Sequence, residues 1–182
     1  SVSNGVKIQM LIGEYRLNES VTVDTGKGKV TLTTASGSDP LFPKQDPGTT
    51  STIRRAYAGD SMFNVSRDLT LETIILDGAK GSYKASTDGG IANVPGGGKL
   101  TIHNGATLQN SRTSLKGGAV FVAPHGKVTI TGGTVNKNES DDDGAGIYLA
   151  EGSILNLSGN PDFGGTGINV SGNIRLDHGN FK

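Results

Sequence analysis

The sequence has no cysteine and no tryptophan, and aromatic residues make up only 5% of its 182 positions. Without cysteine, disulfide bonds cannot stabilise the fold. Lysine and arginine together number 17, as do aspartate and glutamate, so no net charge attracts nucleic acid or an anionic membrane. No apolar run approaches the roughly 18 residues of a membrane-spanning helix. We therefore expect neither a nucleic-acid partner nor membrane insertion.

Glycine, by contrast, is abundant, with 29 residues in the chain. Glycine suits tight corners because it adopts positive φ without steric cost. Few aromatics and many glycines fit a narrow coil with an aliphatic interior. Stretches that could form a helix are short and broken by glycine, which disfavours helical bundles and α/β enzymes.

Most of the chain repeats one pattern: a glycine-rich turn, an apolar strand, a strand of the form apolar-Thr-apolar, a third short strand and a polar loop. The anchor residues of successive copies are Ile91, Val120, Ile147 and Ile168, which lie 29, 27 and 21 positions apart. A more divergent copy begins at Met62. A period in this range is typical of stacked repeats. Three short strands cannot bury their apolar side chains without neighbouring copies.

The pattern predicts an all-β fold, a right-handed parallel β-helix (β-solenoid) with about six or seven coils. Within a copy, Leu100 and Ile102 alternate with Thr101, which places the aliphatic side chains inside the coil and threonine outside. The right-handed sense follows from the strong preference for right-handed crossovers between parallel strands.

We expect one continuous domain with an atypical beginning. Residues 1–60 would form lead-in coils and a capping loop, and residues 61–182 the β-helix repeats. The segment 36–50 contains three prolines and is too long for a plain corner, so it either caps the first coil or shapes a site. The last copy is still in progress at Lys182, so we expect the domain to continue beyond it.

The polar loops that follow the third strand of each copy are the first candidate for a binding site. They would stack into one surface, and their sequences vary while the coil repeats, as in scaffolds that carry recognition loops. Lys84, Arg112, Lys116 and Lys137 could form a basic strip for an acidic glycan, and Tyr83 could stack on a sugar. The alternative is that these are solvated charges that keep the molecule soluble.

A run of three aspartates, Asp141, Asp142 and Asp143, is the candidate for a metal site. Carboxylates and loop carbonyls are the ligands that calcium prefers. The spacing matches neither an EF-hand loop nor a calcium-binding nonapeptide repeat. Calcium is therefore the one cofactor considered, and a charged exposed corner is the alternative.

Several segments together resemble a known family. They are Leu69-Thr-Leu-Glu-Thr-Ile-Ile-Leu-Asp-Gly, Gly117-Gly-Ala-Val-Phe-Val, Gly144-Ala-Gly-Ile-Tyr-Leu-Ala-Glu-Gly-Ser and Leu157-Ser-Gly-Asn-Pro-Asp-Phe-Gly-Gly-Thr-Gly. From about residue 50 onward the chain resembles pectate-lyase-like β-helix domains of large cell-wall-anchored surface proteins of Gram-positive bacteria. The resemblance implies an extracellular, adhesin-like, monomeric domain, attached to the cell wall through segments absent from this chain.

These observations favour a non-catalytic adhesion or display module whose partner is a host or microbial glycan or surface protein. No catalytic residue is assigned. One alternative is a calcium-assisted polysaccharide lyase, with Lys84, Arg112 or Lys116 as base and the three aspartates holding the metal. A second alternative is a structural spacer without a ligand. The fold hosts all three classes, so a site has to decide between them.

Overall fold

The computed structural model describes residues 5–24, 28–36, 48–164, 168–170 and 173–179, the last two ranges by their backbone. Within these ranges the regular structure is entirely β, and the strands pair in parallel. No helix that could cross a membrane occurs among the described residues. The predicted capping loop lies mostly outside them, since residues 37–47 are not described.

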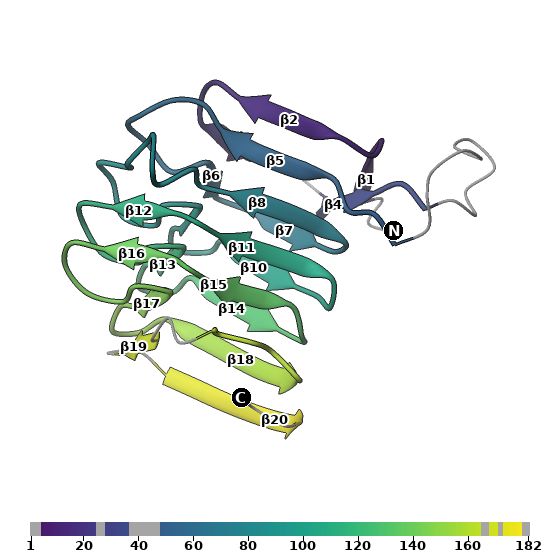
Figure 1. The fold of residues 1–182 in the computed structure, drawn as a ribbon. Coiled ribbons are helices and arrows are strands. Elements are labelled where there is room, and N and C mark those ends of the chain that lie inside the picture. The colour runs from purple at the N-terminus through teal and green to yellow at the C-terminus, as the bar shows by residue number, and fades with distance from the viewer. Residues whose placement is uncertain (1–4, 25–27, 37–47, 165–167, 171–172, 180–182) are drawn as a thin grey trace.

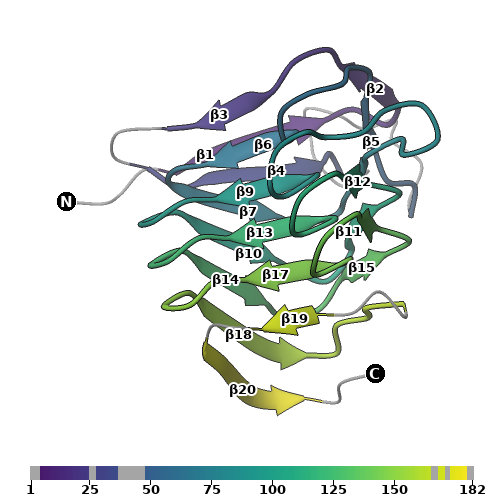
Figure 2. The ribbon, with the colours of Figure 1, turned by 90° about the vertical axis from the view of Figure 1, so that its left-hand side faces the viewer.

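The strands form three long parallel sheets and one short one (Figures 1 and 2). Sheet A contains, in spatial order, β1 (Val6–Met10), β4 (Val30–Thr34), β7 (Asp68–Leu71), β10 (Lys99–Ile102), β14 (Lys127–Ile130), β18 (Ile154–Gly159) and β20 (Asn173–Gly179). Sheet B contains β2 (Glu14–Leu17), β5 (Thr52–Arg55), β8 (Ile74–Asp77), β11 (Ala106–Gln109) and β15 (Thr134–Asn136). Sheet C contains β3 (Val21–Val23), β6 (Phe63–Val65), β9 (Ala92–Val94), β13 (Val120–Val122), β17 (Ile147–Leu149) and β19 (Ile168–Val170). Sheet D pairs β12 (Arg112–Thr113) with β16 (Glu139–Ser140).

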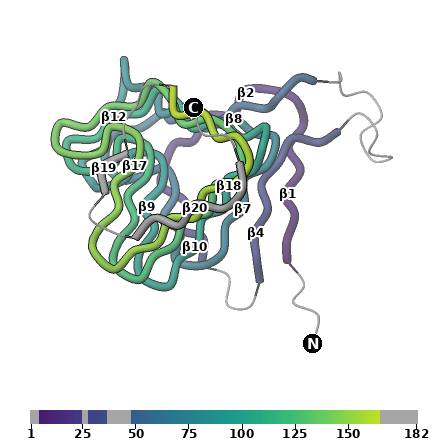
Figure 3. Tube along the Cα trace, turned by 90° about the horizontal axis from the view of Figure 1, so that it is seen from below, coloured from purple at the N-terminus to yellow at the C-terminus, as the bar shows by residue number. Residues whose placement is uncertain are grey.

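The chain visits the sheets in the order A, B, C and then returns to A one level further along the axis. In the described part of the chain, five turns supply a strand to all three long sheets, and β18, β19 and β20 continue the coil. This confirms the parallel β-solenoid and is roughly consistent with the predicted six or seven coils. Viewed from the C-terminal end, the chain runs counter-clockwise as it approaches the viewer, so the coil is right-handed (Figure 3).

The interior is a column of aliphatic side chains in register. Leu69, Leu100, Val128 and Leu155 occupy equivalent inward positions of sheet A, and each is at most 2% exposed. Burial of such a side chain contributes roughly 1.5–3 kcal/mol. The stacked rungs thus supply the hydrophobic core that no single repeat could form.

Among the described residues, the first coil packs against the rest of the protein on one side only. Val6, Ile8, Tyr15 and Val21 align with inward-facing residues of the second coil, but each remains more than a third exposed. The first coil nevertheless extends the sheets of the later repeats, since β1 pairs with β4 and β4 pairs with β7.

Candidate functional site

The loops between sheets B and C stack on one side of the coil, as predicted, and their charges are paired with one another. Lys84 Nζ lies 3.2 Å from Asp141 Oδ2, and Arg112 Nη2 lies 2.7 Å from Asp141 Oδ1. Between the same two levels of the loop column as the Lys84–Asp141 pair, Lys80 Nζ lies 2.6 Å from Glu139 Oε1. The structure therefore brings Lys84 and Arg112 together around one carboxylate.

These pairs shift the ionisation of their members. The hydrogen bond from Arg112, followed by that from Lys84, lowers the pKa of Asp141. The hydrogen bond from Lys80 lowers the pKa of Glu139, and the hydrogen bond to Asp141 raises the pKa of Arg112. A ligand carboxylate would have to compete with Asp141 for two of the predicted basic residues, so the loop column offers less positive charge than the sequence indicates.

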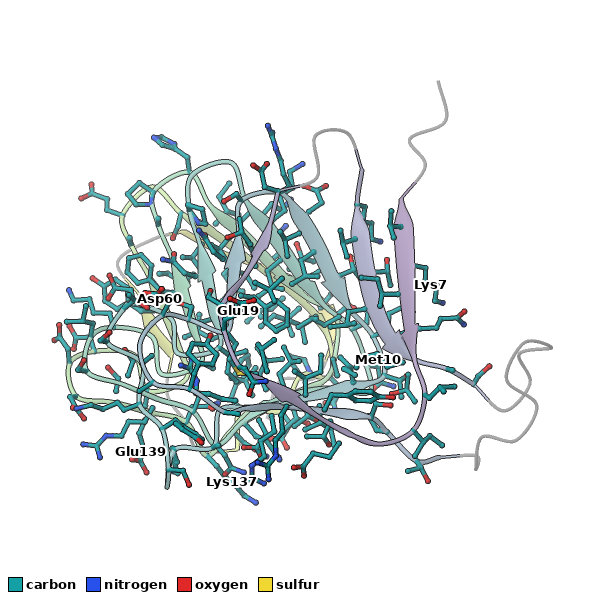
Figure 4. The ribbon with its side chains drawn as sticks, turned by 90° about the horizontal axis from the view of Figure 1, so that it is seen from above. Lys7, Met10, Glu19, Asp60, Lys137 and Glu139 are labelled. Atoms are coloured by element: carbon teal, nitrogen blue, oxygen red, sulfur yellow. The ribbon has the colours of Figure 1, made fainter. Side chains whose placement is uncertain are left out.

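Tyr83 and Lys137 do not join this cluster. Tyr83 is half-buried, and its backbone N–H donates to the Ala79 carbonyl oxygen at 3.0 Å. Lys137 is exposed at a turn with φ of 54° and lies with Glu139 at the periphery of the loop side, far from Lys7 on β1 (Figure 4).

The three aspartates lie exposed at the tip of one loop. Asp141 is occupied by its two cationic partners, and the Asp142 backbone N–H donates to Ser140 Oγ at 3.2 Å. Among the residues that the structure describes, no group of three or more histidine, aspartate and glutamate side chains is arranged to hold a metal ion. The calcium site stays a prediction from the sequence.

Lys116 differs from the other predicted basic residues because it lies against an aromatic pair. Its Nζ is 3.2 Å from the Tyr148 hydroxyl and 4.5 Å from the centre of the Tyr148 ring. The hydrogen bond to Tyr148 raises the pKa of Lys116. The Tyr148 ring stacks on Phe121, with centroids 5.6 Å apart and planes 3° from parallel. The aromatic side chains that could stack on a sugar, Phe121 and Tyr148, therefore lie on strands β13 and β17 rather than in a loop.

Phe121 and Tyr148 belong to an outward column of sheet C, the face on which β9, β13 and β17 lie side by side (Figure 2). The register aligns Thr22 with Asn64, Asn64 with Asn93, Asn93 with Phe121, and Phe121 with Tyr148. The first three levels of this column are therefore short and polar, and the next two are aromatic. Because one face of the Phe121 ring is covered by Tyr148, its other face is turned toward the Asn93 level.

A cleft of about 310 Å³ opens over the polar levels of this column. It is lined by hydroxyl, amide and carboxylate groups, from Ser20, Thr22, Asp60, Ser61, Asn64, Thr87 and Asn93. In the described part of the chain, the side-chain amides of Asn64 and Asn93 make no hydrogen bond. Two unpaired amides in a concave polar site are free to bind a ligand rich in hydroxyl groups.

The wall of the cleft is held by a buried arginine. Arg55 is 1% exposed, and its guanidinium donates to the carbonyl oxygens of Asp60 at 2.8 Å and Gly90 at 2.5 Å. It also lies 4.7 Å from the centre of the Tyr57 ring. Burial lowers the pKa of this guanidinium. Because Asp60 lines the cleft, Arg55 fixes the loop that forms its rim.

Hydroxyl groups connect the two loops of the rim. The Ser61 N–H donates to Thr87 Oγ1 at 3.0 Å, and Ser61 Oγ donates to the Asp88 carbonyl oxygen at 2.8 Å. The carboxylate of Asp88 in turn accepts the Lys116 backbone N–H at 2.9 Å. The cleft and the Lys116–Tyr148 pair are thus parts of one bonded framework.

The sequence analysis did not predict the cleft, although the sequence contains a signal for the column of side chains beneath it. Asn64, Asn93, Phe121 and Tyr148 are each the second residue of the apolar strand that opens a repeat. Alternation places that residue outside the coil, so aligning the repeats would have predicted the column. The loops Asp60–Ser61 and Thr87, which give the column its depth, carry no comparable signal.

No protein-family model, curated protein or solved structure matches this chain.

Proposed function

We propose that this chain is a non-catalytic binding module that recognises a glycan on the outward face of sheet C. The observation that carries the proposal is the cleft with two unpaired asparagine amides beside a stacked aromatic pair. Sugars present hydroxyl groups around an apolar ring face, and such a ligand matches amides and hydroxyls next to an aromatic surface.

The arrangement of groups suggests how the glycan would lie. Asn64 and Asn93 are on successive coils, about 4.8 Å apart, and Phe121 is one coil further. One sugar unit would bind the amides, and its neighbour would contact the free face of Phe121. Lys116, against Tyr148, would stand next to that second unit.

The biological setting is part of the same proposal. The likeness of the repeats to surface-protein β-helix domains supports an extracellular, cell-wall-attached adhesin of a Gram-positive bacterium. A rigid coil with recognition groups on its outward face suits display away from a cell surface.

The test is a glycan array probed with the native chain and with matched variants. Asn93→Ala removes one ligand hydrogen bond, worth about 0.5–1.5 kcal/mol, so we expect up to tenfold weaker binding. Phe121→Asn extends the existing asparagine column and should keep the fold while losing the stacked sugar. Thr107→Ala, at an outward position of sheet B, is the control and should bind normally.

The array should be read with calcium and with chelator, and bound acidic polysaccharides should be monitored for ultraviolet absorbance of unsaturated product. Binding without product that is weaker in Asn93→Ala and Phe121→Asn and normal in Thr107→Ala supports the proposal. Calcium-dependent product would contradict it in favour of a lyase. No binding to any glycan would contradict it in favour of a spacer or a protein ligand.

A further inference from the structure

A second cleft, of about 270 Å³, lies on the outward face of sheet A and belongs to no part of the site above. It is lined by three lysines, three threonines and one aspartate, namely Lys29, Asp68, Thr70, Lys99, Thr101, Lys127 and Thr129. The threonines form a column in register from β7 through β10 to β14. The cleft arises because these short side chains are flanked by longer ones.

The charges of this cleft do not cancel. Lys99 and Lys127 are aligned partners on successive coils. Lys99 Nζ lies 3.4 Å from Asp68 Oδ1, whereas Lys29 and Lys127 form no ion pair with any described residue. Three lysines against one aspartate leave the cleft with two net positive charges, on a chain whose total charge is zero.

The donor set suits anions that are bound through point charges. Lysine ammonium groups bind oxyanions such as phosphate esters in this way, whereas arginine provides a planar fork for bidentate binding of carboxylate or phosphate. The cleft has no arginine, and its threonine hydroxyls can each donate one hydrogen bond. Successive levels lie about 4.8 Å apart along the axis, so a linear ligand could place one ester group at each lysine.

We infer that this cleft binds a linear, hydroxyl-rich polymer that carries sulfate or phosphate esters. Thr101 and Thr129, which are half-buried, would take the hydroxyl groups of the chain above the buried Thr70. Lys99 and Lys127 would take successive esters. A single-stranded nucleic acid fits less well, because its binding depends on aromatic platforms. No aromatic residue occupies an outward position in the described side chains of sheet A, from β1 to β18.

This inference is independent of the glycan proposed for sheet C and is tested with different probes. Binding of the native chain to dextran sulfate and to poly(glycerol phosphate) is measured by calorimetry over a range of salt concentrations, with unmodified dextran as the neutral probe. The two charged probes separate the two sources of ester. We expect binding to at least one of them and none to dextran.

Variants test whether the charged polymer binds in this cleft rather than elsewhere on the surface. The double change Lys99→Gln and Lys127→Gln should weaken it at least tenfold and lower the slope of log affinity against log salt by about two, one for each lysine. Lys137→Gln removes one lysine charge from an exposed turn and should change neither the affinity nor the slope. Asp68→Asn should strengthen binding several-fold, because it frees Lys99 from its acidic partner.

An equal loss in Lys137→Gln would overturn the inference, because it would show attraction to charge anywhere on the surface. Absence of binding to both charged polymers would overturn it as well. Tighter binding of a single-stranded oligonucleotide than of either polymer would show that the cleft serves nucleic acid instead. Stronger binding by the Asp68→Asn variant cannot arise from damage to the fold. It therefore distinguishes an effect on binding from an effect on stability.

Discussion

At the scale of single residues, the least expected feature is the charged side chain at the edge of the core. A buried guanidinium is stable only when its donors are satisfied. Arg55 meets this condition with two backbone carbonyl oxygens and the Tyr57 ring. Its hydrogen bonds tie a loop of one coil to Gly90, which lies in the next, so it links the rim of the cleft to the stack.

Arg55→Ala should destabilise the chain by about 2–3 kcal/mol, because the buried Gly90 carbonyl and the part-buried Asp60 carbonyl would both lose the guanidinium donor. Arg54→Ala removes the same side chain from the exposed position next to it and should change stability by about 0.5 kcal/mol or less. Urea unfolding of both variants measures the difference. Equal losses would show that the Arg55 hydrogen bonds contribute nothing specific.

The contribution of Asp141 in the acidic loop to the stability of the fold should depend on pH. Arg112 and Lys84 lower the pKa of Asp141 in the folded chain. A carboxylate with a lowered folded pKa stabilises the fold above its unfolded pKa, and this contribution is lost as pH falls through the folded pKa. Asp141→Asn should therefore lower Tm slightly at neutral pH, and the deficit should vanish in acid below the ordinary aspartate value of 3.8.

Thermal melts of Asp141→Asn across this pH range, beside Asp142→Asn, check the prediction. Asp142 is exposed in the same loop and forms no ion pair with the described residues, so its variant should track the native chain. The effect is small because the pairs face solvent. A deficit that persists unchanged into acid would show that the Asp141 carboxylate is not the cause.

At the scale of elements, the strands were predictable and the loops were not. The sequence pattern placed Thr101 outside and Leu100 inside because alternation is fixed by the backbone, and the register confirms both. The pairing of Arg112 with Asp141 joins two loops 29 positions apart. Loop conformations carry no periodicity, so the sequence indicated a basic strip where the structure has neutralised pairs.

Some glycines in these loops are required by close approach between coils. A Cβ atom on Gly118 would lie 2.5 Å from the Glu139 carbonyl oxygen and would clash with the Ala145 carbonyl oxygen of the next coil. A Cβ atom on Gly81 would meet nothing within 4 Å.

Gly118→Ala should therefore cost on the order of 1–3 kcal/mol, because the two coils must separate locally. Gly81→Ala is the matched control and should be close to neutral. Chemical denaturation of the two variants gives the comparison. A neutral Gly118→Ala would mean that the coils are packed less closely than the structure shows.

At the scale of the whole molecule, the coil converts a repeated sequence into columns of aligned side chains. Each outward position of a strand becomes one level of a column, so two separate faces acquire different chemistry from the same fold. Sheet C presents amides and aromatic rings, and sheet A presents threonines and lysines. The repeats predict the scaffold and its columns, but the loops Asp60–Ser61 and Thr87 that give the sheet C column its depth carry no repeat signal, so the cleft is seen only in the structure.

The most direct test of the account is an NMR titration of the ¹⁵N-labelled chain with a glycan that binds it. Asparagine side-chain NH₂ groups give their own signals, so contact with the cleft can be observed at the proposed atoms. The account predicts that the Asn64 and Asn93 side-chain signals move most, together with the Phe121 backbone amide. Shifts confined to the loops around Lys84, Arg112 and Asp141, with the two asparagine signals unmoved, would contradict it.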